Sequence, residues 1–293
     1  MSLESQTIYG WPVAIDLTLG GTGAGAFLMA IVLNALRGQQ SFADIVFLAG
    51  PVLVLMGAVI LLADIAVRRR FYRIFSNVKS WTARGAWILT FFIIFALIYY
   101  MISSPPLGQS AWANSTLFSE AIAVLTVLFG IFVMIYPGFL MGTIQAIPFW
   151  NTPLLPLLFL LSGLANGSAF LMLIIPFFHT HSSIGPATLQ GLGGTTAGLL
   201  LFQAASLYAF MERAGRGNVA CQESLSLFRV HLKGKIILGI IIPVCLILLT
   251  ILMHNPLLLP LFLMAAALLT LTGGLLLRHA IIRAGVFLPR FVI

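Results

Sequence analysis

Eight apolar segments, each about long enough to cross a lipid bilayer, fill nearly the whole chain. Of the 293 residues 60% are hydrophobic and only 8% are charged, whereas roughly a quarter of the residues in soluble domains are charged. A helix needs about 20 apolar residues to span the hydrocarbon. The sequence therefore predicts an all-α integral membrane protein with eight transmembrane helices, at about 11–36, 44–67, 84–103, 117–138, 153–177, 187–211, 235–253 and 257–280.

The polar connections between these segments are too short to form a soluble domain. The longest cover about 68–83 and 212–234, and segments of that length cannot bury a core of their own. We therefore expect a single membrane domain over 1–293.

Two segments of the chain resemble each other. Gly20 pairs with Gly163, and the sequence Ala-Phe-Leu-Met occurs at 26–29 and again at 169–172. This pattern favours a parallel duplication into two four-helix bundles, 1–143 and 144–293. Chance similarity between two glycine-rich helices is the alternative.

Positive charge is distributed unevenly between the two ends of the predicted helices. Of the 15 lysines and arginines, only Arg37 lies on one side, and the rest lie within 68–84, 213–235 and 278–290. Cytoplasmic loops carry an excess of Lys and Arg, so we expect both termini in the cytoplasm. Topology accounts for the net charge of +8, and we expect no nucleic-acid partner.

The first predicted helix contains Asp16 and a glycine-rich run. Residues 21–26 formally match the dinucleotide fingerprint, which requires a βαβ unit that a membrane span cannot supply. Gly21 and Gly25 instead form a small-xxx-small pair, which permits close helix contact. A second face of the same helix carries Asp16, Gly20, Gly23 and Phe27.

The carboxylate thus borders a groove without side chains that could admit a flat ring. A buried carboxylate is costly unless it is paired or faces a cavity, which favours a functional role for Asp16. The alternative is that the glycines only pack helices and that Asp16 is solvated in the headgroup region near Trp11.

Five further polar residues are candidates for a site. Asp64 and Arg68 are spaced for an i, i+4 ion pair, with a proton relay as the alternative. Glu120 lies near the non-cytoplasmic end of the fourth helix, where it is interfacial or part of a proton path. Tyr136 and Gln145 fall at the same depth as Asp16, so we expect the three side chains to converge.

The cysteines and histidines argue against metal cofactors within this chain. Cys221 and Cys245 are too few for an iron–sulfur cluster, which typically takes four thiolates. Two stacked haems would need four histidines on facing helices inside the bilayer, but only His279 lies near a span interior. We expect no haem, cluster or other metal here, and expect His279 to meet a helix C-terminus or an acid.

Motifs spread over the whole chain resemble those of one family, the polysulfide reductase/NrfD-type membrane subunits of molybdopterin and iron–sulfur oxidoreductase complexes. The resemblance rests on their order and spacing. The motifs are Trp11-Pro12, Leu19–Phe27, Asp64, Ser80-Trp81-x-x-Arg84-Gly85-Ala86-Trp87, Tyr136-Pro137-Gly138-Phe139-Leu140, Ile147–Asn151, Leu158-Phe159-x-x-Ser162-Gly163 and Gly273-Gly274-x-x-x-Leu277-Arg278.

The resemblance implies a pair of four-helix bundles that bind menaquinone or ubiquinone, without haem, at the end touching an iron–sulfur subunit. Asp16 falls where the family places a polar residue of the quinone site, often histidine, and Tyr136 matches the tyrosine of its Tyr-x-Gly motif. These two would carry the proton chemistry, and Gly20, Gly23 and Gln145 would complete the quinone site.

The implied protein is a membrane anchor that exchanges electrons between the quinone pool and its partners in the inner membrane of a prokaryote. Those partners are a four-cluster-type iron–sulfur subunit, a molybdopterin or other catalytic subunit, and membrane lipids. The family usually faces the periplasm, but the charge distribution places the Asp16 end, and therefore the docking site over the 145–153 link, in the cytoplasm. The alternatives are a secondary transporter, a proton-conducting membrane protein, and a structural anchor without quinone.

Overall fold

The computed structural model describes residues 4–7, 9–37, 40–64, 80–103, 116–178, 186–232, 234–253 and 258–288. Within these ranges the protein is all-helical, as predicted, apart from short connections and one isolated β-bridge. The α-helices are α1 (Trp11–Arg37), α2 (Gln40–Asp64), α3 (Trp81–Ser103), α4 (Thr116–Gly142), α5 (Leu154–Ile174), α6 (Pro186–Gly215), α7 (Val219–Leu232), α8 (Ile242–Met253) and α9 (Leu259–Arg283). Two 3₁₀ turns, η3 (Pro148–Trp150) and η4 (Ile175–Phe178), and a π-helical turn, η5 (Ile237–Ile241), complete the described structure.

A helix coincides with every segment that the hydropathy pattern predicted. By length and composition, six described helices can cross a membrane, or seven if α7 and α8 form one span bent by 61°. The protein is thus a multi-pass membrane protein. The count of eight spans and the cytoplasmic position of the termini remain predictions.

The segment expected to be a polar connection, 212–234, contains the helix α7. Its buried side chains recur at helical spacing on one face, which packs against the core while the charged residues face outward. The pattern is too short and too polar to resemble a membrane span, so hydropathy alone did not find it.

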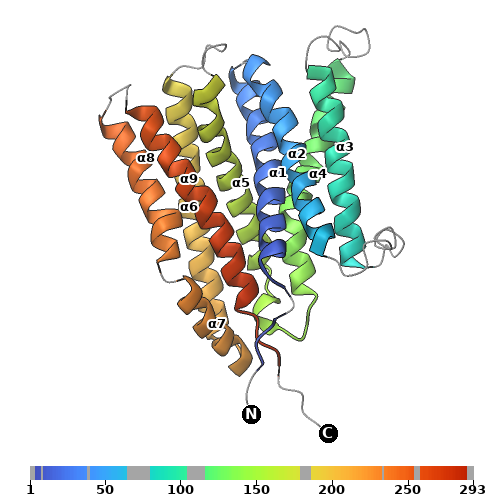
Figure 1. Ribbon diagram of the computed structural model, residues 1–293, viewed down its shortest axis with the longest axis vertical. Coiled ribbons are helices and arrows are strands. Elements are labelled where there is room, and N and C mark those ends of the chain that lie inside the picture. The colour runs from blue at the N-terminus through green and yellow to red at the C-terminus, as the bar shows by residue number, and fades with distance from the viewer. Residues whose placement is uncertain are drawn as a thin grey trace.

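The long helices run roughly side by side, with α1 and α5 at the centre (Figure 1). α1 contacts α2, α4, α5 and α9, and α5 contacts α1, α4, α6 and α9. One end of the assembly, which we call the terminal end, carries both chain termini, α7 and the connection between α4 and α5 (Figure 1). The division at residues 143 and 144 remains a proposal.

Glycines bring the backbones of α1 and α5 into direct contact. A Cβ on Gly25 would overlap the carbonyl group of Gly163, and a Cβ on Gly167 would overlap the backbone of α1 at Gly25 and Ala26. A Cβ on Gly21 would lie 3.5 Å from the Cα of Gly163. The predicted small-xxx-small contact of Gly21 and Gly25 is therefore confirmed, and α5 is the helix that they contact.

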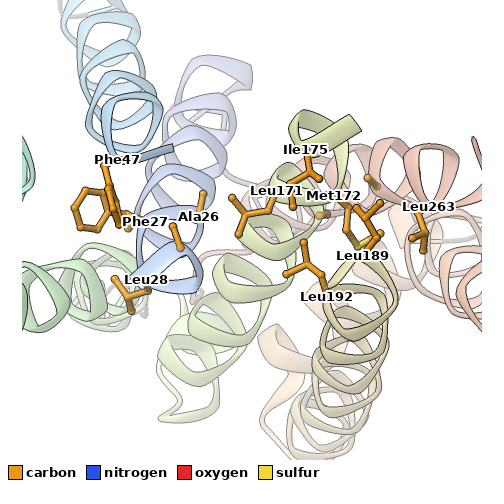
Figure 2. Packing of buried hydrophobic residues seen from close by; sticks show 14 of the residues in the cluster. Ala26, Phe27, Leu28, Phe47, Leu171, Met172, Ile175, Leu189, Leu192 and Leu263 are labelled. Atoms are coloured by element: carbon orange, nitrogen blue, oxygen red, sulfur yellow. The ribbon is translucent and has the colours of Figure 1, made fainter. Parts of the chain in front are cut away.

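The larger buried cluster crosses the molecule through this central contact. It begins with Phe47 of α2, continues through Phe27 of α1 and Leu171 of α5, and reaches Leu192 of α6 and Leu263 of α9 (Figure 2). Because the cluster includes helices from both proposed halves, those halves share one continuous core.

Hydrogen bonds tie several segments together at the terminal end. Gln6 donates from its backbone to Gly285 and from its side chain to the carbonyl of Ile282. Trp150 of η3 is fully buried and donates from its indole nitrogen to the carbonyl of Ile281, 3.0 Å away. Trp150 therefore belongs to the protein core.

Candidate functional site

Asp16 of α1 is a buried carboxylate, with 4% of the residue exposed. It lies against α2 at Gly57, where a Cβ would be 2.9 Å from Oδ1 of Asp16. No described residue donates a hydrogen bond to the Asp16 carboxylate or forms an ion pair with it. A buried acid without a protein partner inside a membrane helix marks a candidate functional site.

Tyr136 of α4 lies close to Asp16. The two side chains interact electrostatically, and the tyrosine is buried apart from 8% of its surface. The aromatic ring packs on Gly85 of α3, where a Cβ would lie 2.8 Å from Cδ2 of Tyr136. Only a residue without a side chain leaves room for the ring at this point. The structure thus brings together two of the three side chains that were expected to converge.

An aromatic groove of about 640 Å³ runs between α3 and α4 beside Tyr136. Ring pairs build its walls: Trp81 stacks on Phe139 with their centroids 5.5 Å apart, and Phe91 packs on Phe129 at 5.3 Å. Arg84 is the charged residue among its lining side chains and lies 5.0 Å over the Trp81 ring. The groove is lined by Trp81, Arg84, Trp87, Ile88, Phe91, Phe129, Phe132, Ile135, Tyr136 and Phe139.

The two glycines of the predicted site are in helix contacts. A Cβ on Gly20 would lie 3.9 Å from Val133 of α4, an ordinary van der Waals distance. A Cβ on Gly23 would overlap the carbonyl oxygen of Gly50 and lie 3.0 Å from Leu53 of α2. The glycine face below Asp16 is therefore filled by neighbouring helices at Gly23, and quinone binding by Gly20 and Gly23 stays a prediction.

The other predicted residues are either exposed or lie outside the described part of the chain. Gln145 is exposed on the connection that follows α4, and Glu120 is exposed near the start of α4. Asp64 ends α2, but its side chain, and Arg68 altogether, lie outside the described residues. The roles of these four residues stay predictions.

Arg278 of α9 is a site residue that the sequence did not reveal. The charge distribution had counted it among the basic residues of the cytoplasmic side, yet it is buried in the core, with 1% exposure. Its guanidinium donates to Ser162 Oγ of α5 at 3.0 Å and to the carbonyl oxygen of Gly274 at 3.2 Å. When the Asn166 amide is oriented so that its nitrogen donates to the carbonyl of Thr270, its oxygen accepts a further hydrogen bond from Arg278 at 3.2 Å.

Arg278 therefore ties α9 to α5 inside the core, close to α1 at Gly21. In the sequence, the Gly273-Gly274 pair one turn before Arg278 was the feature that could have indicated close helix packing at this arginine. Gly273 contacts the backbone of Gly239 in η5, and Gly274 leaves room for the side chain of Asn166. Such close approach brings the helices near enough for one arginine to bridge them.

The partner of the His279 side chain differs from the one expected. Its ring stacks on Trp11, with the two ring centroids 3.8 Å apart and an angle of 15° between the planes. Neither ring nitrogen has a hydrogen-bond partner among the described residues, although both are buried. The expected acid or helix C-terminus is therefore not its partner in the described structure, and an aromatic ring covers it.

Cysteine and histidine side chains do not assemble into a metal centre within the described residues. No group of three or more His, Cys, Asp or Glu side chains there could hold a metal ion. Cys221 is buried on α7 and Cys245 is exposed on α8.

These features define a multi-pass helical membrane protein with a buried acid beside an aromatic groove. The sequence matches the family described as Polysulphide reductase, NrfD, over residues 2–289, and the protein belongs to this family. It is 29% identical to the C subunit of the polysulfide reductase of Wolinella succinogenes, covering 96% of this sequence and 95% of that protein. It is 25% identical to the protein NrfD of Escherichia coli K12, covering 55% of this sequence and 58% of that protein.

Proposed function

We propose that this chain is the quinone-binding membrane subunit of a multi-subunit oxidoreductase, exchanging electrons between the membrane quinone pool and an iron–sulfur partner subunit. Membership of the polysulphide reductase family supports this assignment. The observation that carries it is the buried Asp16 carboxylate, which has no partner among the described residues, near Tyr136, which lines an aromatic groove.

The groove suits the apolar part of a quinone. Small-molecule sites are concave, largely apolar, and contain a few polar groups that fix the orientation of the ligand. The stacked rings of Trp81, Phe91 and Phe129 offer flat apolar surfaces to a ring and its isoprenoid tail. The exposed lining of the groove is almost entirely apolar, and Tyr136 and Arg84 are among the residues that line it.

Asp16 and Tyr136 supply the proton chemistry in this proposal. A quinone takes up two electrons and two protons when it is reduced to quinol. The Tyr136 hydroxyl is a hydrogen-bond donor for a quinone oxygen, and the Asp16 carboxylate is an acceptor for a quinol proton. Tyr136 both lines the groove and interacts with Asp16, so it connects the ligand space to the buried acid.

The partner subunits are proposed to dock at the terminal end. An iron–sulfur subunit there would cover the 145–153 connection and reach a quinone near Tyr136, and a molybdopterin or other catalytic subunit would bind beyond it. The uneven distribution of Lys and Arg supports a cytoplasmic position for this end in the inner membrane of a prokaryote. Protons would then be exchanged with the cytoplasm.

Photolabelling with an azidoquinone tests the location of the site. The purified complex would be irradiated with the probe, with excess unlabelled quinone as competitor, and the labelled peptides identified by mass spectrometry. We expect competitor-sensitive label in α3 and α4. Trp87→Ala should lower the labelling yield, whereas Phe202→Ala, at an exposed position on α6, should leave it unchanged. Specific label confined to α6–α9 would contradict the proposed site.

A further inference from the structure

Three basic residues lie near His279 at the terminal end of the second half of the chain. Arg283 follows His279 by four residues on the same face of α9, and Lys235 borders a small space together with Gly273 and Leu277 of α9. The His279 ring also interacts electrostatically with Lys235, Arg283 and His231. They come from three elements: α7 provides His231, the segment just before η5 provides Lys235, and the last turn of α9 provides Arg283. The described ion pair of the protein, between Arg216 and Glu212, involves none of them.

The His279 ring is the buried member of this cluster. Only 8% of the residue is exposed. Both ring nitrogens are without a hydrogen-bond partner in the described structure. Buried polar atoms nearly always have a partner. The ring is covered by Trp11, which is itself 45% exposed. An imidazole without a hydrogen-bond partner in the described structure thus lies beneath an exposed aromatic ring, near the cations Lys235 and Arg283.

The backbone places the cluster at the border between a surface helix and a membrane span. The chain bends by 61° between α7 and the segment that begins at Ile237. Gly234 makes this bend with a φ of 78°, a left-handed conformation that glycine adopts readily. Lys235 therefore stands at the bend itself, and it borders a small space together with residues of α6 and α9.

The surface next to Lys235 is apolar. Ile237, Leu238 and Ile241 are 52%, 44% and 49% exposed, immediately after the cation along the chain. Exposed apolar side chains of this kind on a membrane protein face acyl chains, while cations and tryptophan lie at headgroup level. A water-soluble partner would leave these apolar side chains uncovered, so the combined surface fits a lipid better than a protein.

We propose that His231, Lys235, His279 and Arg283, with Trp11, form a binding site for the phosphate headgroup of an anionic phospholipid. Basic pockets between membrane helices are suited to acidic headgroups. The acyl chains would lie along Ile237, Leu238 and Ile241, and the phosphate would contact Lys235 and Arg283. A small space between α6, η5 and α9 continues inward from Lys235 to the buried Gln203 side chain. This site is independent of the proposed quinone site in the first half of the chain.

Native mass spectrometry of the purified full-length chain tests this site. After delipidation, phosphatidylglycerol and phosphatidylcholine with identical acyl chains would be titrated separately. We expect tighter binding of phosphatidylglycerol. Lys235→Gln/Arg283→Gln should weaken that binding roughly 30-fold, because each cation near an anionic lipid contributes about fivefold.

Two variants serve as controls. Arg229→Gln removes the same charge from an exposed position on α7 and should change the affinity by less than about twofold. Lys235→Arg/Arg283→Lys keeps both charges and should bind like the wild type. If the double glutamine variant is not recovered folded, Lys235→Gln and Arg283→Gln are measured singly, each with an expected loss of roughly fivefold.

Three results would overturn the proposal. Equal affinity for the two lipids would show that headgroup charge is not recognised. An equal loss in Arg229→Gln would show that net charge, and not this cluster, controls binding. Displacement of phosphatidylglycerol by millimolar inorganic phosphate would make free phosphate the preferred ligand of these side chains.

Discussion

Asp16 of α1 occupies the space that a side chain on Gly57 of α2 would need. A Cβ at Gly57 would lie 2.9 Å from Oδ1 and 3.1 Å from the carbonyl oxygen of Asp16. The carboxylate is thereby held between two helices that are in contact along much of their length. Its position depends on how closely these two backbones approach, and this can be changed without touching the acid itself.

Gly57→Ala is expected to impair quinone-linked turnover although Asp16 itself is not mutated. The added methyl group must displace the carboxylate, and a displacement of about 1 Å in a reactive group can reduce the rate about 100-fold. We expect a loss of about 10- to 100-fold in quinone reduction or quinol oxidation by the purified complex. Gly198→Ala on α6 is the matched control, because its Cβ would meet nothing within 4 Å. Similar turnover in the two variants would contradict this role of Gly57.

Gly25→Ala is expected to disrupt the central contact of the membrane domain. Its Cβ would overlap the carbonyl group of Gly163, which belongs to the backbone and cannot rotate away. Overpacking a well-packed core costs about 1–3 kcal/mol. We expect a lower thermal midpoint in detergent and a lower yield of monodisperse protein. Gly194→Ala, which has open space around it, should be as stable as the wild type or slightly more stable.

Arg278→Met is expected to destabilise the protein. Methionine fills the space of the arginine stem but not that of the guanidinium, so Ser162 Oγ loses its donor and the Gly274 carbonyl loses its side-chain donor. Leaving buried polar groups unpaired costs about 1–3 kcal/mol each. Chemical denaturation in mixed micelles would measure the loss, with Arg213→Met at an exposed position on α6 as the control. An unchanged unfolding midpoint in Arg278→Met would show that the buried hydrogen bonds contribute little.

Cysteine labelling tests the orientation in the membrane. Gln145 and Glu120 are both exposed. Gln145 follows the C-terminal end of α4, and Glu120 lies near its N-terminal end. In a background with Cys221 and Cys245 replaced by serine, an impermeant maleimide added to intact cells should modify Glu120→Cys and spare Gln145→Cys. Inverted vesicles should show the reverse. The opposite pattern would place the terminal end, and the docking site proposed there, outside the cytoplasm.

Helix positions were predictable because the thickness of the bilayer sets both the length of an apolar segment and the length of the helix that it forms. Every predicted span coincides with a described helix. The contact of α1 with another helix through Gly21 and Gly25 was also predictable from their spacing, although the identity of α5 as the partner was not. Only the three-dimensional arrangement shows which small residues face each other.

Features that depend on several elements were not predictable. Arg278 looked like a cytoplasmic charge, because the sequence cannot show that Ser162 and Gly274 satisfy its guanidinium inside the core. His279 was expected to meet an acid, yet Trp11 from the other end of the chain covers it. The aromatic groove likewise combines α3 and α4 side chains, and no single helix sequence shows that they form one wall.

Quinone-linked turnover of the purified complex, wild type against Asp16→Asn, tests the central claim most directly. Asparagine keeps the shape of the side chain but can neither accept a proton at neutral pH nor carry a negative charge. Activity of the catalytic partner with an artificial dye serves as the control for assembly. We predict that quinone turnover falls about 100-fold or more, the size of effect expected for loss of a general base, while dye activity is retained. Unchanged quinone turnover in Asp16→Asn would contradict the proposal that this carboxylate takes part in quinone chemistry.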